Sequence, residues 1–478
     1  MSMRKIAALV ISGLLVGVVS GAGTAFHVDP LQGDDSADGL SPAHAWKTWK
    51  RFTAVARPGS SLLLKRGCVY ALPLPVVAGD SQAPIVYGAY GEGPKPVLEG
   101  HIVDLAKPEL WKQAGTDIWE TDKSVPEVAN VIFDDVHCGN MRYSKEELRQ
   151  KGEWFQDPSG KGPLFIYATE NPAKAWRKVE LIAAGYGQVL AGKECTYIRL
   201  ENLVFRKIGT HGIWIKSGAS DISIRRCDLT LIGGAIFRAD EFSQKYGERF
   251  VQRRVRFGNA IETWGDASNI MVEGCRIYDI FDGGFDIQGV DGVASNIVVR
   301  NNIFWNCGYD SLDIAHGIRP DNVVFEQNTC WNGGEGWALQ GEPRPRYSLN
   351  APDQLGYLCN LENSFAWKDG SISIRKNIFC NAPDSRCFNF GPKPPTGMHL
   401  IKVDQNCYFQ VNPKDALVQL GTKRFTATEF DAYRKTTGWD TRSVVGDPQF
   451  VAPALGDFRL KPDSPAQGLG SQMSLQPE

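Results

Sequence analysis

Short segments in the middle of the chain alternate apolar and polar residues, which is the periodicity of β-strands and too brief for a helix. Five such segments resemble one another: Asp221–Cys227, Asn269–Cys275, Asn296–Asn302, Asn322–Asn328 and Ser371–Asn377. Their successive offsets along the chain are 48, 27, 26 and 49 residues. Two offsets therefore fit single coils of a solenoid, and the two longer ones fit a coil with an insertion of similar size.

Stacking these copies places their Ile and Val side chains in the core and aligns their last residues in a second internal column. That column consists of Cys227, Cys275, Asn302, Asn328 and Asn377. Buried asparagines are tolerated there because each amide can bond to the amide above and below it. The two cysteines are expected to be small apolar fillers, or to form a disulfide with each other.

A further short strand precedes each copy, and its register follows from residue type. The matching triplets are Ile213–Ile215, Ile261–Thr263, Phe285–Ile287, Leu312–Ile314 and Trp337–Leu339. The flanking residues of each triplet are mostly large and apolar and must point inward, so the middle residue points outward. Glu262, Asp286 and Asp313 are therefore expected to stack on one outer face, bordered by Asp282, Asp310 and Glu335.

Adjacent carboxylates in such a column lie roughly 5 Å apart, since neighbouring coils are about 4.8 Å apart. Like charges at this spacing raise at least one pKa unless a cation or an Arg neutralises them. Acids on the outside of a β-helix can be ordinary solvated residues, but three in register repel one another and indicate a function. Paired carboxylates at this spacing suit glycosidic bond cleavage by general acid and base or nucleophile.

The residues around the column suggest how a ligand is held. Two positions further along each strand, Trp264, Gln288 and Gln340 also point outward, and His316 lies beside them. Trp264 can stack on a sugar ring or pack under the loop at 237–258, and the two amides can bond hydroxyl groups. Arginines occupy the next loops, at Arg319, Arg344 and Arg346. They either bind an anionic glycan or neutralise the carboxylates.

The five repeated segments between residues 221 and 377 resemble coils of the pectin-lyase-like right-handed parallel β-helix superfamily. The start of the mature chain is similar to the start of such folds at Phe26–Pro30, Gly33–Gly39 and Pro58–Leu64, and the end is similar at Asp447–Phe450, Gly456–Leu460 and Ser464–Pro465. The resemblance implies an all-β solenoid with carbohydrate activity. Its members include hydrolases, lyases and uronan epimerases, and fold alone does not choose among them.

The ends and interruptions of the repeat complete the expected organisation. Residues 1–25 are predicted to be a signal peptide, with Arg4 and Lys5 ahead of an apolar run and no cysteine after the cut, so secretion or a periplasmic location is expected. Residues 26–478 are expected to form one β-helix domain with an N-terminal capping helix that starts near Pro42 and places Ala45, Trp46, Trp49 and Phe52 on one face. A β-rich insertion is expected at 101–190, and site-forming loops at 237–258 and 335–368.

Composition gives no indication of nucleic-acid binding, membrane association or a metal site. A net charge of −2 and a pI near 6.4 give no nucleic-acid or membrane signature, and the histidines and the eleven cysteines show no metal-ligand spacing. We therefore expect a secreted glycoside hydrolase without a cofactor, acting on a polysaccharide or oligosaccharide, with an anionic substrate as one option. Its catalytic candidates are Asp286, Asp313, Glu262, Asp282 and Glu335.

Two alternatives stay open. In a polysaccharide lyase or uronan epimerase, Glu262, Asp286 and Asp313 would hold Ca²⁺, and an Arg, Lys or His would abstract a proton. A non-catalytic solenoid that binds or adheres to glycans would yield no product at all.

Overall fold

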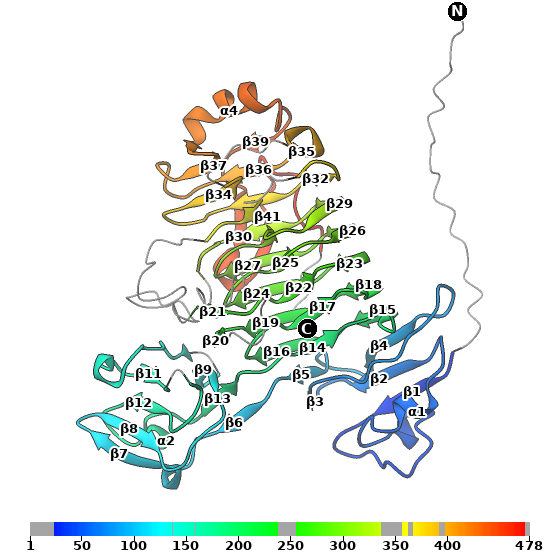
Figure 1. Ribbon diagram of the computed structural model, residues 1–478, viewed down its shortest axis with the longest axis vertical. Coiled ribbons are helices and arrows are strands. Elements are labelled where there is room, and N and C mark those ends of the chain that lie inside the picture. The colour runs from blue at the N-terminus through cyan, green and yellow to red at the C-terminus, as the bar shows by residue number, and fades with distance from the viewer. Residues whose placement is uncertain are drawn as a thin grey trace, which may run out of the picture.

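Three long sheets wind around a common core in the computed structural model (Figure 1), which describes residues 23–135, 137–157, 159–237, 255–335, 356–361, 367–391 and 397–473. Their strands run parallel from coil to coil, which confirms the predicted right-handed parallel β-helix. The core is one continuous apolar cluster that extends from Phe26 to Trp439.

Sheet A contains the predicted repeats. Its strands, in order, are β1 (Ala25–Val28), β2 (Ser61–Lys65), β4 (Ile85–Tyr90), β15 (Thr196–Glu201), β18 (Ser220–Arg225), β23 (Ala267–Glu273), β26 (Val293–Arg300), β29 (Arg319–Glu326), β32 (Ile372–Arg375) and β35 (Ile401–Asp404). The five copies pair in the expected register, with Ile222, Ile270, Ile297, Val323 and Ile372 stacked in the core.

Sheet B forms the next wall of each coil. It consists of β3 (Val69–Ala71), β5 (Val97–Glu99), β16 (Val204–Ile208), β19 (Asp228–Ile232), β24 (Arg276–Ile280), β27 (Ile303–Cys307), β30 (Thr329–Trp331), β33 (Ile378–Cys380), β36 (Cys407–Phe409) and β39 (Val444–Val445).

Sheet C is the wall that carries the predicted acids. Its strands are β14 (Gln188–Leu190), β17 (Ile213–Lys216), β22 (Ile261–Trp264), β25 (Phe285–Gln288), β28 (Leu312–Ile314), β31 (Cys359–Asn360), β34 (Arg386–Asn389), β37 (Ala416–Leu420) and β38 (Lys423–Phe425). Only the last pair, β37 and β38, is antiparallel among these described strands.

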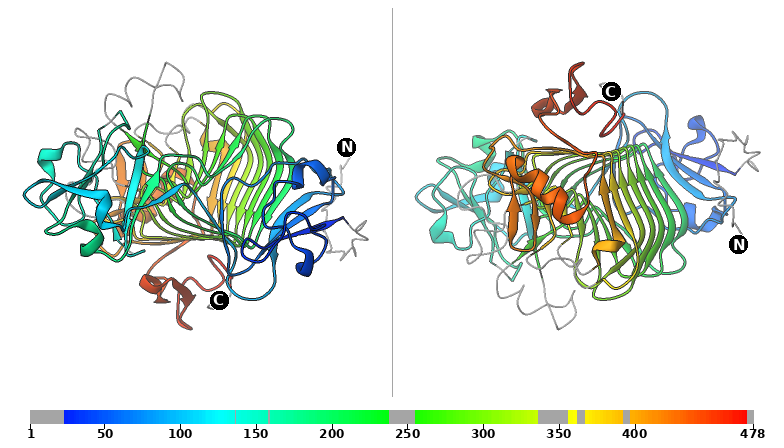
Figure 2. Two further views of the ribbon diagram at one scale, coloured as in Figure 1. Left: turned by 90° about the horizontal axis from the view of Figure 1, so that it is seen from below. Right: turned by 90° about the horizontal axis from the view of Figure 1, so that it is seen from above.

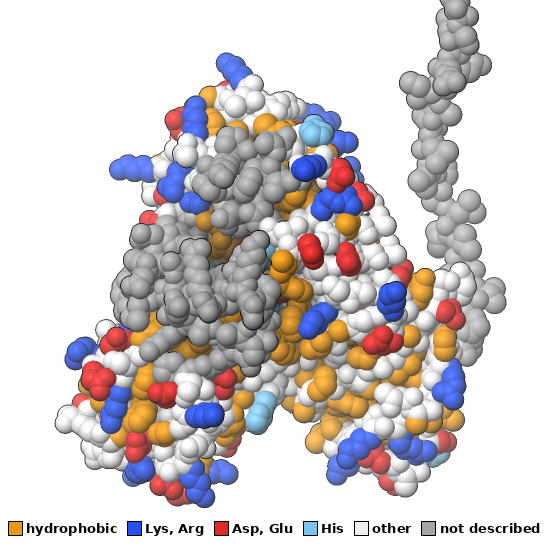
Figure 3. Space-filling view, in the orientation of Figure 1, with side chains coloured by type: hydrophobic (Ala, Val, Ile, Leu, Met, Phe, Trp, Pro, Cys, Tyr) orange, Lys and Arg blue, Asp and Glu red, His pale blue; other side chains and the backbone are white. Residues whose placement is uncertain are grey.

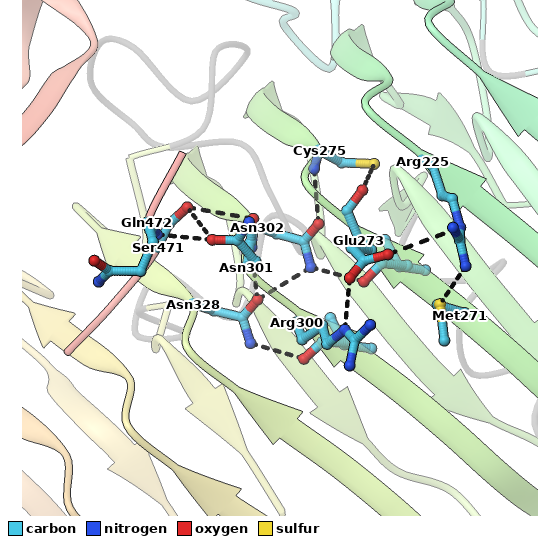
Figure 4. A network of polar contacts seen from close by, with 12 residues as sticks. Arg225, Met271, Glu273, Cys275, Arg300, Asn301, Asn302, Asn328, Ser471 and Gln472 are labelled. Atoms are coloured by element: carbon cyan, nitrogen blue, oxygen red, sulfur yellow. Dashed lines mark hydrogen bonds and ion pairs between the residues drawn. The ribbon is translucent and has the colours of Figure 1, made fainter. Parts of the chain in front are cut away.

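An asparagine ladder fills the corner between sheets A and B. Asn302, Asn328, Asn377 and Asn406 are fully buried, and each of the first three accepts and donates along the stack at 2.8–3.2 Å. Figure 4 shows Asn302 and Asn328 as two of its rungs. Cys227 and Cys275 extend the column as free thiols, and none of the eleven cysteines, all of which are described, forms a disulfide.

The N-terminal end is covered differently from the prediction. The continuous helix expected from Pro42 is wrong: the chain forms a 3₁₀ turn at Pro42–His44 and a separate short helix, α1 (Phe52–Val55). Between them Trp46 adopts extended backbone and bridges Val28 of β1, because strand pairing and burial of its indole outweigh helix propensity. Phe52 and Trp46 still close the end of the core.

The C-terminal end is closed by helix α4 (Phe430–Thr437), which buries Phe430 and Tyr433 against the last coil. The chain then returns along the outside of sheet B as the hairpin β40 (Phe450–Ala452) and β41 (Asp457–Leu460), seen at the side of the solenoid in Figure 2. Its last described part reaches Asn301, which accepts hydrogen bonds from Ser471 and Gln472 (Figure 4).

The segment between β5 and β14 projects from the first coils as two small antiparallel sheets (Figure 1). One consists of β6 (Ile102–Asp104), β9 (Val128–Phe133), β10 (His137–Cys138) and β13 (Val179–Ala183), and the other of β7 (Trp111–Gly115), β8 (Ile118–Thr121), β11 (Trp154–Phe155) and β12 (Phe165–Tyr167). With the short helix α2 (Pro172–Ala175) they surround an apolar core of their own. Among the described residues, no helix is long and apolar enough to cross a membrane.

Candidate active site

The three predicted acids occupy one outer column of sheet C. Glu262 of β22 pairs in register with Asp286 of β25, which pairs with Asp313 of β28. Their neighbours on the same strands, such as Phe285 and Leu312, point into the core as expected. The carboxylates are nevertheless covered, with exposed fractions of 2% for Glu262 and 1% for Asp286 and Asp313. They are a buried acid cluster and not solvated surface charges.

The alignment of the following coil was wrong. Trp337–Leu339 was expected to continue the column, but these residues lie outside the described ones, and the strand that pairs with β28 is β31. Asn360 is therefore the neighbour of Asp313, and Asn389 of β34 follows it. The column thus changes from carboxylates to amides at this coil, a change that the apolar triplet pattern could not reveal because β31 is short and follows an insertion.

Gln288 links the two central acids. Its Nε2 lies 3.1 Å from Asp286 Oδ2 and 2.7 Å from Asp313 Oδ2, so one amide donates to both carboxyl groups. Asp313 also accepts from Asn360 Nδ2 at 2.9 Å through its other oxygen. Both oxygens of Asp313 thus face donors, as suits an ionised carboxylate, which can only accept.

Asp286 lies in a different environment. Burial raises the pKa of its carboxyl group well above the usual range, and Asp310, Asp313, Asp282 and Glu262 raise it further by repulsion. Its Oδ1 is buried and has no hydrogen-bond partner among the described residues. The two neighbouring carboxyl groups therefore lie in contrasting environments, the arrangement from which acid and base roles arise.

Gly283 makes the room that Asp286 occupies. A Cβ atom at this position would lie 1.9 Å from Asp286 Oδ1, far inside van der Waals contact. Glycine is required here because the Asp286 carboxylate approaches the backbone closely, and not because the backbone adopts a conformation that favours glycine.

A second column lies in the turns that precede these strands, three residues before the first column. It consists of His211, Asn259, Gly283 and Asp310. The Asn259 backbone nitrogen lies 3.2 Å from His211 Nδ1, and Asn259 Oδ1 accepts from the Gly283 N–H. The interpretation of the sequence singled out Asp310 as a border residue but missed His211 and Asn259. The signal was available, because aligned coils of a solenoid place residues at the same offset from their strands above one another.

Glu262 is held by this second column. His211 Nδ1 lies 2.8 Å from Glu262 Oε2, and Asn259 Nδ2 donates to the same oxygen at 2.9 Å. The imidazole packs among aromatic rings, with the centroids of Phe257 and Trp214 5.3 and 5.4 Å away. Glu262 is therefore anchored away from Asp313, and its carboxylate has partners that Asp286 Oδ1 lacks.

Asp310 brings a third carboxylate to the central pair. One oxygen each from Asp286, Asp310 and Asp313 lies within 4.8 Å of the others, which is the separation of two ligands on opposite sides of a Ca²⁺ ion bound at about 2.4 Å. All three are buried hard oxygen donors, so the residues fit the calcium ion that a lyase would need. The same three groups without an ion must share protons to limit repulsion.

The edge of the cluster is only partly covered. Trp264, Gln288 and His316 are half-buried, and the rings of Trp264 and His316 lie 5.9 Å apart. Burial lowers the pKa of His316, while Glu262 and Asp282 partly oppose that change. Asp282 is also half-buried and close enough to act on Asp286, so the structure brings two of the three predicted border residues, Asp282 and Asp310, to the site.

Two of the other five predicted residues are described. Arg319 is at the start of β29 in sheet A, where it forms an ion pair with Asp369 at 3.1 Å. Glu335 follows β30 of sheet B and is the last described residue before 336–355. Gln340, Arg344 and Arg346 lie outside the described residues, as does most of the loop predicted at 237–258.

Arg256, from the basic part of that loop, is fully buried between the insertion and the solenoid. Its guanidinium donates to the carbonyls of Gly234 and Ala129 and to Asn130 Oδ1, and lies 4.5 Å from the ring centroid of Phe281. Burial lowers its pKa to about 10. It joins β21 (Arg256–Phe257) and its partner β20 (Ala235–Ile236) to β9 of the insertion, rather than neutralising the acid column.

Charge on the visible face gives no sign of a polyelectrolyte site. Figure 3 shows acidic and basic side chains interspersed over the described part of this face. Among the described residues, three like charges in register lie in the covered column of sheet C.

Comparison with known proteins agrees with this architecture. A family model described as a right handed beta helix region matches residues 179–347, which include all three acids of the column. The fold is a right-handed parallel β-helix. The uncharacterized protein YwoF of Bacillus subtilis (strain 168) is 26% identical over 196 residues, and the match covers 39% of each chain. The aligned region thus spans about two fifths of that relative.

Similar solved structures include enzymes. The GH136 lacto-N-biosidase from Eubacterium ramulus is 14% identical, with 88% of this chain and 67% of that chain covered and a TM-score of 0.43. Pectate lyase Pel9A is 16% identical, with 96% and 95% covered and a TM-score of 0.45.

Proposed function

We propose that this protein is a secreted glycoside hydrolase that cleaves a polysaccharide or oligosaccharide, neutral or anionic, at the acid column of sheet C. The observation that carries the proposal is the pairing of Asp286 with Asp313 on neighbouring coils, buried together in contrasting hydrogen-bond environments. A mutually repelling pair is costly to keep, and function is the usual reason for keeping one.

The two environments suggest the two roles. Asp286, with its raised pKa and unbonded Oδ1, is suited to hold a proton and donate it to the leaving oxygen of a glycosidic bond. Asp313, which accepts two amide donors, is suited to act as base or nucleophile. Gln288 keeps the two groups in one geometry because it donates to both.

The spacing favours retention of anomeric configuration. Adjacent coils lie about 4.8 Å apart, near the separation of about 5 to 5.5 Å between the carboxyl groups of retaining enzymes and short of the 6.5 to 9.5 Å of inverting ones. In this mechanism Asp313 attacks the anomeric carbon while Asp286 protonates the departing oxygen, and water then releases the sugar with Asp286 as base. The half-buried Trp264 and His316 mark the side from which the sugar would approach.

A screen on acidic and neutral polysaccharides tests this proposal. Polygalacturonate, alginate, xylan and a neutral galactan are incubated with the protein, and both new reducing ends and near-ultraviolet absorbance are recorded with and without a chelator. A hydrolase produces reducing ends without absorbance and is indifferent to the chelator. Binding without product in every case, equal for wild type and Asp286→Asn, would instead identify a non-catalytic glycan-binding solenoid.

A calcium-dependent polysaccharide lyase or epimerase is the second candidate, and the cluster of Asp286, Asp310 and Asp313 favours it because it fits Ca²⁺. The ion would neutralise a uronate carboxylate, and these three residues would hold it. Here the same screen gives ultraviolet absorbance from the unsaturated product, or an altered uronate composition, and the chelator abolishes either one.

A further inference from the structure

A chain of side-chain hydrogen bonds leads from Asp313 to a cation two coils away. Asn360 Nδ2 donates to Asp313 Oδ1 at 2.9 Å, and Asn389 Nδ2 donates to Asn360 Oδ1 at 2.7 Å. Arg386 Nε in turn donates to Asn389 Oδ1 at 3.2 Å. Asn360 and Asn389 are 1% and 2% exposed, so water competes little for these bonds.

The two ends of this chain fix its direction. An arginine side chain can only donate, so the oxygen of Asn389 must face Arg386 and its nitrogen must face Asn360. The same reasoning turns the nitrogen of Asn360 toward Asp313. The backbone N–H of Gly391 also donates to Asn389 Oδ1, at 3.3 Å, and strengthens this orientation. Reversing any amide would place two acceptors or two donors in contact.

We propose that Arg386 is a positioning residue that fixes the orientation of the Asp313 carboxyl group through Asn389 and Asn360. The guanidinium polarises each amide in turn, so that Asp313 receives a stronger donor than an isolated asparagine would supply. Arg386 is itself held, since its Nη2 donates to the Tyr357 hydroxyl at 2.9 Å and its guanidinium lies 4.5 Å from the centre of that ring. As a role in catalysis, the inference rests on the proposed function of Asp313.

Carboxyl groups on the other side of Asp313 make such support necessary. Among the described residues, one oxygen each of Asp286 and Asp310 lies within 4.8 Å of an Asp313 oxygen. Carboxyl groups that repel one another do not hold Asp313 in place, so the Asn360 amide and the residues behind it supply the orienting contact on this side.

The next residue of the column offers a matched control. Gln419 of β37 pairs in register with Asn389, but its amide turns away, donating to the Gly421 carbonyl at 2.8 Å and accepting from Arg424 Nε at 3.1 Å. Replacing it removes an amide from the same column without cutting the chain to Asp313.

The Asn360 side-chain amide signal at one fixed pH tests the proposal without any substrate. In protein labelled with ¹⁵N at asparagine side chains, this signal is assigned by its absence in Asn360→Ser, and it reports the hydrogen bond to Asp313. Arg386→Met and Asn389→Leu are expected to move it, because each removes a contact that polarises the Asn360 amide. Gln419→Leu leaves it unchanged.

On the substrate found by the screen, Arg386→Met and Asn389→Leu should lower kcat about tenfold with KM nearly unchanged, since both act on the placement of Asp313 and not on substrate binding. Arg386→Lys should restore part of the lost rate, because it returns a donor toward Asn389 Oδ1. An unmoved Asn360 signal in both Asn389→Leu and Arg386→Met would overturn the proposal, as would an equal change in Gln419→Leu. Should Asn389→Leu fail to fold, Arg386→Met tests the same chain from its half-buried outer end. A moved signal in a protein whose Asp313→Asn variant keeps full activity would refute the proposed catalytic role and leave the amide chain standing.

Discussion

Two columns of charged side chains run along the outside of this solenoid, and they are built in opposite ways. On sheet A the residues in register alternate in sign: Arg225, Glu273, Arg300, Glu326, Arg375 and Asp404. Glu273 lies 3.8 Å from Arg225 and 2.7 Å from Arg300, a network that Figure 4 shows in part. On sheet C, Glu262, Asp286 and Asp313 follow one another with the same sign.

Exposure makes the contrast sharper. The sheet A column is partly open to water, with 27% of Glu273 and 39% of Arg300 side-chain area exposed, whereas the sheet C acids are buried. Alternating signs in solvent are what selection for stability alone would produce. Like charges that are buried together lower the stability of the fold. The acid column of sheet C is therefore the better candidate for a functional role.

The largest effect is expected from neutralising the acid column. Asp286→Asn and Asp313→Asn should each lower kcat at least about a hundredfold, because each removes a proton donor or acceptor of the proposed reaction. Asp286→Asn should not lower the unfolding free energy, because the amide relieves repulsion within the cluster. Glu273→Gln on sheet A serves as the control, with full activity expected. Full activity in both asparagine variants would show that the acid column of sheet C has no catalytic role.

A smaller loss is expected from filling the space beside Asp286. In Gly283→Ala the new Cβ atom would lie 1.9 Å from Asp286 Oδ1. The carboxylate must therefore move, and activity should fall at least about tenfold. Gly185→Ala is the matched change, since a Cβ there meets nothing within 4 Å. Equal activities of the two alanine variants would show that the position of Oδ1 does not matter.

Much of this contrast could be predicted from residue types. The Ile and Val alternation gave the sheet A register, the asparagine column and the outward alignment of Glu262, Asp286 and Asp313, because a strand's period of two is local and strict. Burial of the acids could not be predicted, since it depends on side chains from other coils. Nor could the pairing of β28 with β31, because a long insertion separates the two strands in the sequence and hides which later segment continues the column.

His211 and Trp46 show two different kinds of failure. His211 occupies the same place in its coil as Asn259 and Asp310 do in theirs, and it was missed because only acids were singled out among these turn residues. Trp46 fitted an amphipathic helix by its spacing, but a bridge to Val28 and burial in the end cap decided its backbone, and neither is visible in local sequence. Local periodicity thus specified the coils, and tertiary contacts specified the cap and the cover of the site.

The acid column should also impose a pH dependence on stability. The pKa of Asp286 is raised in the folded state, so its stabilising contribution is complete below the ordinary aspartate value and is lost as pH rises toward the folded pKa. While only the folded state holds this proton, each pH unit lowers the unfolding free energy by about 1.4 kcal/mol. Urea unfolding from pH 4 to 8 should show this decline in wild type and a shallower one in Asp286→Asn. Parallel curves would contradict the raised pKa.

The smallest effect comes from making sheet A resemble sheet C in sign. Glu273→Arg would align three arginine-type cations in register and should lower the unfolding free energy by about 1 kcal/mol, since the pairs it breaks are partly exposed. Salt should recover much of that loss, because exposed charges are screened over about 10 Å at 0.1 M. Buried acids are screened much less, so the stability difference between wild type and Asp286→Asn should change little in the same salt series. Equal salt responses would mean that the two columns do not differ in their access to water. Burial could then not be the cause of the raised pKa of Asp286.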